Sequence, residues 1–208
     1  MAWIICAILS GLCAAVLITV LSVYDDELPC PGVWQLGIVM ALTAGLSARL
    51  VFLHGECVWA TGLFTVYLAL VIYTDARIRK VYTLPNYLML GGVLLLDLVL
   101  SLRAGAWDPV PLVAGGIFLA MGLAGLYGRG DGFVLAVVMI YLGMLWEDAV
   151  MAILVTVLAG CLTFVLYSGG DYLWHRWHGG QRIAFWKAPR PFLPSMGIGI
   201  LVCACLVT

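Results

Sequence analysis

Residues 2–24 read AWIICAILSGLCAAVLITVLSVY, a run without a charged side chain, and this run decides the fold class. A helix needs about 20 mostly apolar residues to cross the hydrocarbon core of a bilayer. The run has no basic residue before it and is longer than the apolar region of a typical secretory signal. We therefore interpret it as a retained transmembrane helix.

The composition extends this interpretation to the whole chain. Of the 208 residues, 64% are hydrophobic and 10% are charged, whereas soluble domains average about 45–50% apolar and about 25% charged residues. The excess apolar surface predicts a lipid bilayer as the solvent. A net charge of −1 and ten Lys and Arg residues argue against nucleic acid as a partner.

Apolar segments recur along the chain and predict an all-α, polytopic transmembrane bundle of about eight helices in one domain, residues 1–208. They are expected at about residues 3–23, 33–53, 57–74, 87–102, 110–126, 132–145, 149–167 and 192–207. Between the third and fourth segments we expect a proline-containing turn at residues 83–86.

Basic residues indicate the orientation. If the segments alternate in direction, one face receives eight basic residues and the other receives two, Arg49 and Arg103. The positive-inside rule makes the richer face cytoplasmic, so both termini lie outside. We expect a multi-pass protein of the plasma (inner) membrane. The eight residues of the cytoplasmic face are Arg77, Arg79, Lys80, Arg129, Arg176, Arg182, Lys187 and Arg190.

Two aspartates fall at this cytoplasmic face. Asp75 follows the third segment, and Asp131 lies in a glycine-rich turn before the sixth. Acids near membrane-spanning segments are costly and mark functional sites. Two close carboxyls can share one proton, so that one activates water and the other donates to a carbonyl. Because a helix start favours an anion and a helix end disfavours it, our hypothesis is that Asp131 is the base and Asp75 the proton-bearing partner. The nearby Arg77, Arg79 and Arg129 leave the reverse assignment open.

The motifs around these acids resemble those of type IV prepilin peptidases, the GxGD membrane aspartic peptidases. Residues 74–86 read TDARIRKVYTLPN, residues 128–131 read GRGD, and residues 191–194 read PFLP. The resemblance covers about residues 54–208 and leaves the first two helices, residues 3–53, peripheral to this motif-bearing core. It implies a short-form aspartic endopeptidase that removes the basic leader of prepilin or pseudopilin-like proteins, in type IV pilus assembly or protein secretion.

The resemblance also implies roles for single residues. Asp75 and Asp131 would be the catalytic pair, and Gly128, Gly130, Pro85 and Asn86 would support the turns and the substrate. Gly128 and Gly130 allow positive φ and close backbone approach, although they also suit a simple helix-breaking turn. Three departures stand out: the stretch between Asp75 and Asn86 is longer than usual, Phe133 replaces a frequent Lys, and the cysteine-rich insertion linked to N-methylation is absent.

Other polar residues leave alternatives open. Asp97 lies inside the fourth segment and has two possible roles. It is either a third acid that contacts the substrate or a structural acid in the bundle interior. Two interpretations of the acidic cluster Asp25, Asp26 and Glu27 stay open. The cluster either attracts a basic leader peptide or forms a solvated loop. His175 and His178 lack a third ligand, and the cysteines form no CxxC pair. We expect no metal and no cofactor.

Two other function classes compete with the peptidase. Intramembrane GxGD proteases of the presenilin kind share the second motif, but they carry a late Pro-Ala-Leu motif that this chain lacks. A proton- or cation-coupled transporter would also place acids in the membrane, but it would not need the basic stretch followed by Pro85 and Asn86. An inactive assembly factor is a further option, for which Phe133 gives some support.

Overall fold

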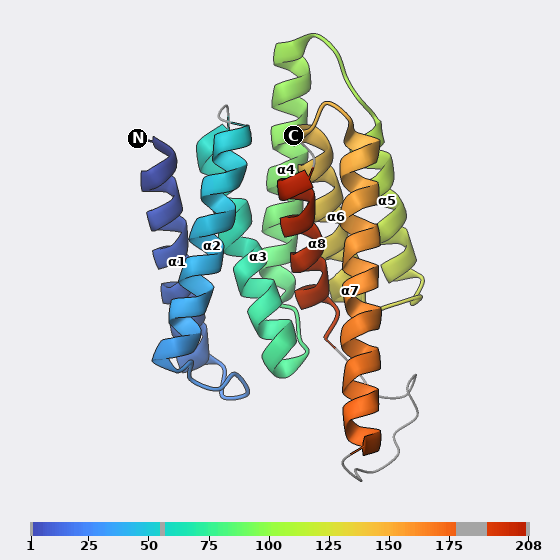
Figure 1. Cartoon of the computed structure of the whole chain (residues 1–208). Helices are drawn as coiled ribbons and strands as arrows, with labels where there is room; N and C mark the ends of the chain where they lie inside the picture. The colour runs from blue at the N-terminus through green and yellow to red at the C-terminus, as the bar shows by residue number, and fades with distance from the viewer. Residues whose placement is uncertain (1, 55–56, 178–190, 207–208) are drawn as a thin grey trace.

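Eight α-helices make up the part of the chain that the computed structural model describes, which is residues 2–54, 57–177 and 191–206, the side chains of residues 175 and 176 excepted. Figure 1 shows them as an up-and-down bundle with the N-terminus and the C-terminus at one end. The all-α prediction is confirmed. The helices are α1 Ala2–Tyr24, α2 Val33–Leu53, α3 Val58–Ile78, α4 Thr83–Ala104, α5 Val110–Leu123, α6 Arg129–Leu145, α7 Ala149–Trp177 and α8 Leu193–Leu206.

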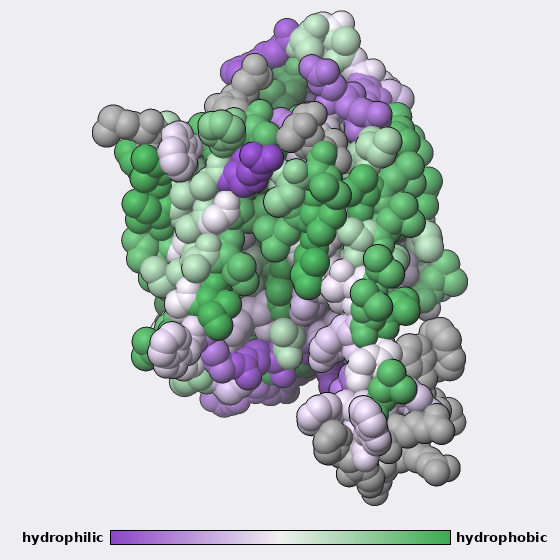
Figure 2. All heavy atoms as spheres, in the orientation of Figure 1, coloured by the Kyte–Doolittle hydropathy of each residue, from purple (hydrophilic) through white to green (hydrophobic). Residues whose placement is uncertain are grey.

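Five of these helices, α1, α2, α3, α4 and α7, are long and apolar enough to cross a membrane. Their outward faces carry many exposed large apolar side chains, which water would not favour and lipid accepts. Figure 2 shows the resulting apolar belt across the face in view, with hydrophilic residues gathered mostly toward the two ends. The protein is a multi-pass membrane bundle.

Helix α6 forms the centre of the bundle. Every residue from Val134 to Gly143 is buried, and α4, α5 and α7 pack around this helix. Helices α1 and α2 lie on the other side of α3 (Figure 1). There, Ile18 and Leu28 form a smaller cluster with Leu70 and Tyr73 of α3. Helix α3 therefore connects the two halves of the molecule.

Four predicted helix boundaries need correction. Helix α4 begins at Thr83, so Pro85 and Asn86 lie in its first turn and not in a separate turn. A proline is tolerated there because the first N–H groups of a helix have no intrahelical acceptor. Helix α3 continues to Ile78 and α6 begins at Arg129, so both acids lie inside helix ends. Helix α7 runs ten residues past its expected end, to Trp177.

Glycines allow α5 and α6 to pack closely. A Cβ atom built on Gly122 would lie 2.8 Å from the Cα atom of Gly132, and one on Gly143 would lie 2.8 Å from Pro111. Helices in lipid associate through such small residues because the backbones can then approach each other. Residue 132 directly follows Asp131, so this contact also positions the start of α6.

Gly122→Ala is expected to destabilise the bundle, because the new methyl group would meet backbone atoms of α6 that cannot rotate away. Overpacking of this kind costs about 1–3 kcal/mol. Unfolding in detergent micelles measures the loss. Gly116→Ala on the same helix is the matched control, since a Cβ there meets nothing within 4 Å. Equal stability of the two variants would contradict the packing argument.

Candidate functional site

Both motif aspartates lie at the same end of the bundle. Asp75 is in the last turn of α3 and Asp131 is in the first turn of α6, and Figure 1 places both helix ends at the bottom of the view. Asp75 is buried, with 6% of its surface exposed, and Asp131 is half-buried. The charge of Asp75 acts on the carboxyl group of Asp131. The fold thus brings together two acids that are far apart in the sequence.

Asp75 is bound by the start of α8. Its Oδ2 atom accepts the backbone N–H of Leu193 at 2.9 Å, and the backbone N–H of Phe192 also donates to this carboxylate. Helix α8 has no Ser, Thr, Asn or Asp immediately before it. The α3 carboxylate therefore serves as its N-terminal cap, binding free N–H groups at the positive end of the helix dipole.

This contact changes the expected roles of the two acids. The sequence-based assignment considered the C-terminal dipole of α3, which opposes a charge on Asp75. The start of α8 adds N–H donors that favour the ionised carboxylate, whereas burial disfavours it. Among the described residues, no hydrogen-bond donor reaches the carboxyl group of Asp131. The hydrogen bonds alone favour charge on Asp75 and the shared proton on Asp131, the reverse of the hypothesis drawn from the helix dipoles.

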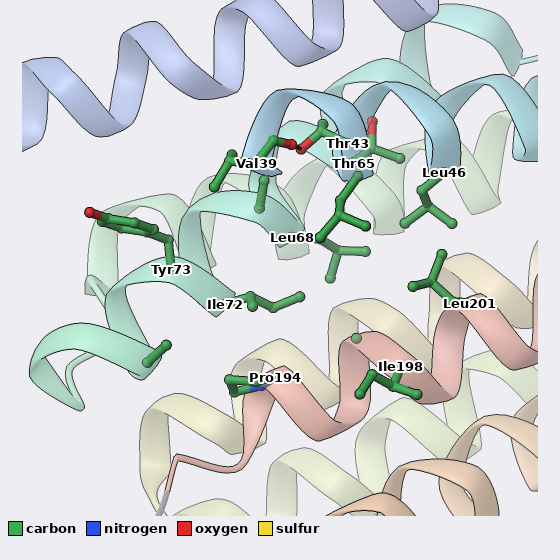
Figure 3. A pocket seen from close by; sticks show the side chains of 14 residues that line it. Val39, Thr43, Leu46, Thr65, Leu68, Ile72, Tyr73, Pro194, Ile198 and Leu201 are labelled. Carbon is green, nitrogen blue, oxygen red and sulfur yellow. Dashed lines mark hydrogen bonds between the residues drawn. The ribbon is translucent and has the colours of Figure 1, made fainter. Parts of the chain in front are cut away.

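An apolar groove ends beside the Asp75–Leu193 contact. It lies between α2 and α8, has α3 as its floor and holds about 260 Å³ (Figure 3). Two of its lining residues are Ala76 and Pro194, and each directly follows a partner of that contact in the sequence. The candidate site therefore continues into a membrane-facing, apolar surface.

Gly128 leaves room for the side chain of Asp131. A Cβ atom on Gly128 would lie 2.7 Å from Oδ2 of Asp131, because the carboxyl group folds back toward the start of its helix. Gly128 does not use the positive φ that glycine allows, since its φ is −59°. In this turn the positive φ occurs at Gly125, at 79°. The atoms that crowd this position belong to the side chain of Asp131 and not to another backbone segment.

Gly130 leaves room for the connection between α3 and α4 to pack against it. A Cβ atom on Gly130 would lie 3.0 Å from Cβ of Val81. Tyr127, which the sequence analysis did not single out, lies on the other side of the glycine turn and donates its hydroxyl to the carbonyl of Phe118. Burial raises the pKa of Tyr127, and ionisation of Asp131 would raise this pKa further. Its hydroxyl therefore stays protonated beside the pair at neutral pH.

Asn86 contributes to the site by linking α4 to α3. Asn86 is buried, and its Oδ1 atom accepts the hydroxyl of Tyr67 on α3 at 2.9 Å. This bond joins the start of α4 to the helix that bears Asp75. On α6, Phe133 packs edge-on against Tyr87, with ring centroids 5.0 Å apart. At the position where Phe133 replaces the frequent Lys, this chain thus makes an apolar contact between α4 and α6.

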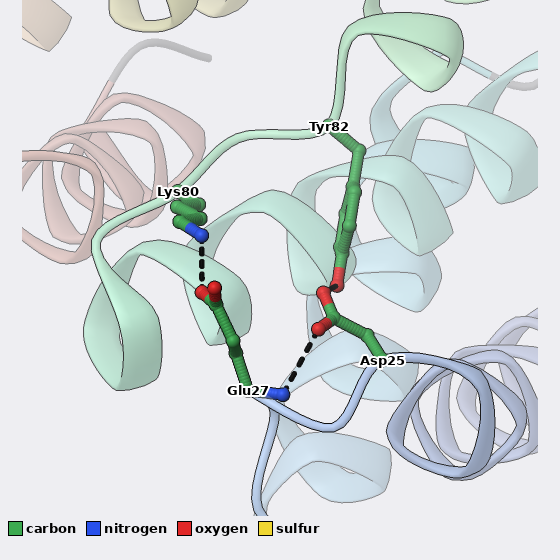
Figure 4. A network of polar contacts seen from close by, with 4 residues as sticks. All are labelled: Asp25, Glu27, Lys80 and Tyr82. Carbon is green, nitrogen blue, oxygen red and sulfur yellow. Dashed lines mark hydrogen bonds and ion pairs between the residues drawn. The ribbon is translucent and has the colours of Figure 1, made fainter.

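The acidic cluster pairs with the basic stretch of the first motif. Tyr82 donates its hydroxyl to Asp25, and Lys80 forms an ion pair with Glu27 (Figure 4). The intervening residue, Val81, packs against Gly130. These contacts form a clasp, which we define as Asp25, Glu27, Lys80 and Tyr82. The clasp connects the α1–α2 loop with the turn beside Asp131, and two of the three acids are therefore partnered within the protein.

The clasp predicts a pH-dependent stability. The hydrogen bond from Tyr82 holds the pKa of Asp25 below its ordinary value. An aspartate with a lowered pKa stabilises the fold above about pH 4, and this contribution disappears as the pH falls through the lowered pKa. The difference in unfolding free energy between wild type and Tyr82→Phe should therefore be present at pH 5–7 and vanish in acid.

Unfolding in detergent across this pH range, with a carboxyl NMR titration of Asp25, measures the effect. Tyr167→Phe is the control, because Tyr167 is exposed on α7. A pH-independent difference for Tyr82→Phe would contradict the proposed hydrogen bond.

One predicted candidate, Asp97, lies apart from the acid pair. Asp97 is buried, and it accepts a hydrogen bond from Trp107 in the connection between α4 and α5, which Figure 1 shows at the opposite end of the bundle. The structure does not bring it to Asp75 and Asp131. The structure does not describe the side chains of His175 and Arg176. His178, Arg182, Lys187 and Arg190 lie outside the described residues.

Fold and site together define a polytopic α-helical membrane protein with a pair of carboxyl groups at one end of its bundle. No protein-family model, curated protein or solved structure matches the chain. The function must therefore be argued from the motifs and from the arrangement of the site.

Proposed function

We propose that this protein is a membrane aspartic endopeptidase that removes the short basic leader of prepilin or pseudopilin-like proteins. The observation that carries the proposal is the juxtaposition of Asp75 and Asp131, close enough for one charge to act on the other. Both belong to motifs that resemble those of one peptidase family, and they come from different helices, α3 and α6.

The geometry supports a division of labour within the pair. Asp75, held by the N–H groups of residues 192 and 193, carries the charge and accepts a proton from the attacking water. Asp131 holds the shared proton and donates it toward the scissile carbonyl, whose oxygen becomes negative in the transition state. The two apparent pKa values of such a pair belong to the pair as a whole.

The location of the site supports cleavage at the membrane boundary. Both acids lie within one turn of a helix end, and four basic residues of the described chain, Arg77, Arg79, Lys80 and Arg129, lie at the same end. The positive-inside rule assigns this end to the cytoplasm, so we propose an active site that faces the cytoplasm from the inner membrane.

The competing functions have less support. An intramembrane protease would place its acids well inside the bilayer, whereas these acids are near helix ends. A proton-coupled transporter needs acidic groups that succeed one another across the membrane. Asp97 instead bonds to Trp107 at the end of the bundle opposite the pair.

Cleavage of a co-expressed substrate tests the proposal. The substrate carries a leader rich in Lys and Arg, followed by an apolar segment of about 20 residues. Wild type should shorten it, and mass spectrometry of the new N-terminus should locate the cut before the apolar segment. Intact substrate in the presence of well-folded wild type, for several different leaders, would overturn the proposal.

A further inference from the structure

The groove between α2 and α8 is lined mostly by hydrocarbon, and Tyr73, whose hydroxyl has no hydrogen-bond partner among the described residues, lies among its lining residues. Its walls and floor include Val39, Leu46, Leu68, Ile72 and Ile198 (Figure 3). Two threonines also line it, but their hydroxyls bond to carbonyls of their own helices, Thr43 to Val39 at 2.7 Å and Thr65 to Gly62 at 2.9 Å. Both threonine hydroxyls already donate within their own helices.

The groove begins at the candidate site and runs into the membrane. Its lining on α3 extends from Thr65 to Ala76, about 16 Å at 1.5 Å per residue. This is about half of the roughly 30 Å hydrocarbon core. The end at Ala76 lies next to Asp75, and α8 lines the same end with Pro194, next to Leu193. The groove and the Asp75–Leu193 contact thus lie at the same ends of α3 and α8.

We infer that this groove binds the first turns of the apolar transmembrane helix that follows the scissile bond of the substrate, an inference that rests on the proposed peptidase function. Helices pack by placing a ridge of side chains into a groove of the neighbouring helices. A substrate helix that lies between α2 and α8 starts beside Asp75. The groove thereby selects the peptide bond that reaches the acid pair, which is the bond just before the apolar segment of the substrate.

Photocrosslinking tests the occupant. A photoreactive amino acid replaces Ile198, which lines the groove and is 44% exposed, in an Asp131→Asn background that retains uncleaved substrate. The matched control replaces Ile117 on α5, which is 54% exposed and faces away from α2 and α8. The probe is the basic-leader substrate with its apolar segment. We expect at least a fivefold higher yield of substrate adduct from position 198 than from position 117.

Filling the groove gives a second readout. Ala69→Phe adds a ring to its floor, and Ala120→Phe is the control on the exposed face of α5. Two substrates are compared, the full probe and a peptide that ends before the apolar segment. For Ala69→Phe, the ratio of kcat/KM for the full probe to kcat/KM for the peptide should fall at least tenfold, and Ala120→Phe should keep the wild-type ratio.

The outcomes separate this inference from the peptidase proposal. Cleavage by wild type with equal adduct yields at positions 198 and 117, or with adducts of lipid or of a second copy of this chain alone, would overturn the groove as the substrate site. A substrate adduct specific to position 198 without any cleavage by wild type would sustain the docking site and overturn the peptidase.

Discussion

Asp131→Asn is expected to reduce the rate of substrate cleavage by about 10²–10⁴-fold, the usual contribution of a general acid or base, while the bundle keeps its stability. The carboxyl group of Asp131 is half-buried, and among the described residues it receives no hydrogen bond that holds the fold together. Asparagine has nearly the same shape but cannot carry the shared proton. Single-turnover cleavage and unfolding in detergent measure the two effects.

Asp75→Asn should reduce cleavage as strongly and should also destabilise the protein. Asp75 accepts N–H groups at the start of α8, and loss of a helix cap costs about 0.5–2 kcal/mol. Asparagine retains an acceptor oxygen but loses the charge that interacts with the helix dipole. A smaller stability loss for Asp75→Asn than for Asp131→Asn would contradict the capping role, and cleavage by both variants at wild-type rate would remove the aspartate mechanism.

Gly128→Ala is expected to lower cleavage by about 100-fold, because a Cβ atom there would lie 2.7 Å from Oδ2 of Asp131. The carboxyl group is the flexible end of its side chain, so it can rotate away and the helix can remain folded. Displacing a catalytic group by about 1 Å can cost about 10²-fold in rate. Cleavage kinetics and detergent unfolding, measured on the same preparation, should show a large loss of rate with a small loss of stability.

The control for this substitution is Gly116→Ala, on α5, which meets nothing within 4 Å and should keep the wild-type rate. A second comparison uses Gly128→Ala together with Asp131→Asn. If the alanine acts by moving the carboxyl group, it should reduce the rate little further in that background. Wild-type cleavage by Gly128→Ala alone would show that the position of this carboxyl group does not control the reaction.

The sequence patterns predicted the positions of the helices better than they predicted the residues at which the helices begin and end. Pro85 was expected to break the chain into a turn, yet it lies in the first turn of α4, where its missing N–H has no cost. The polar residues after Tyr167 were expected to end the seventh helix, yet α7 continues to Trp177. Polarity marks where a helix leaves the apolar belt, and it does not by itself end the backbone hydrogen bonding.

The amino-acid sequence by itself determined the fold class, the approximate positions of the helices and the placement of Asp75 and Asp131 at helix ends. It could do so because hydropathy and helix-breaking residues act over distances of about one helix. Only the tertiary structure decided that α8 caps Asp75, that Tyr82 and Lys80 hold the acidic loop and that a groove opens beside the pair. The contact of Leu193 with Asp75 joins residues 118 positions apart. The packing of whole helices, which no local sequence pattern records, creates all of these features.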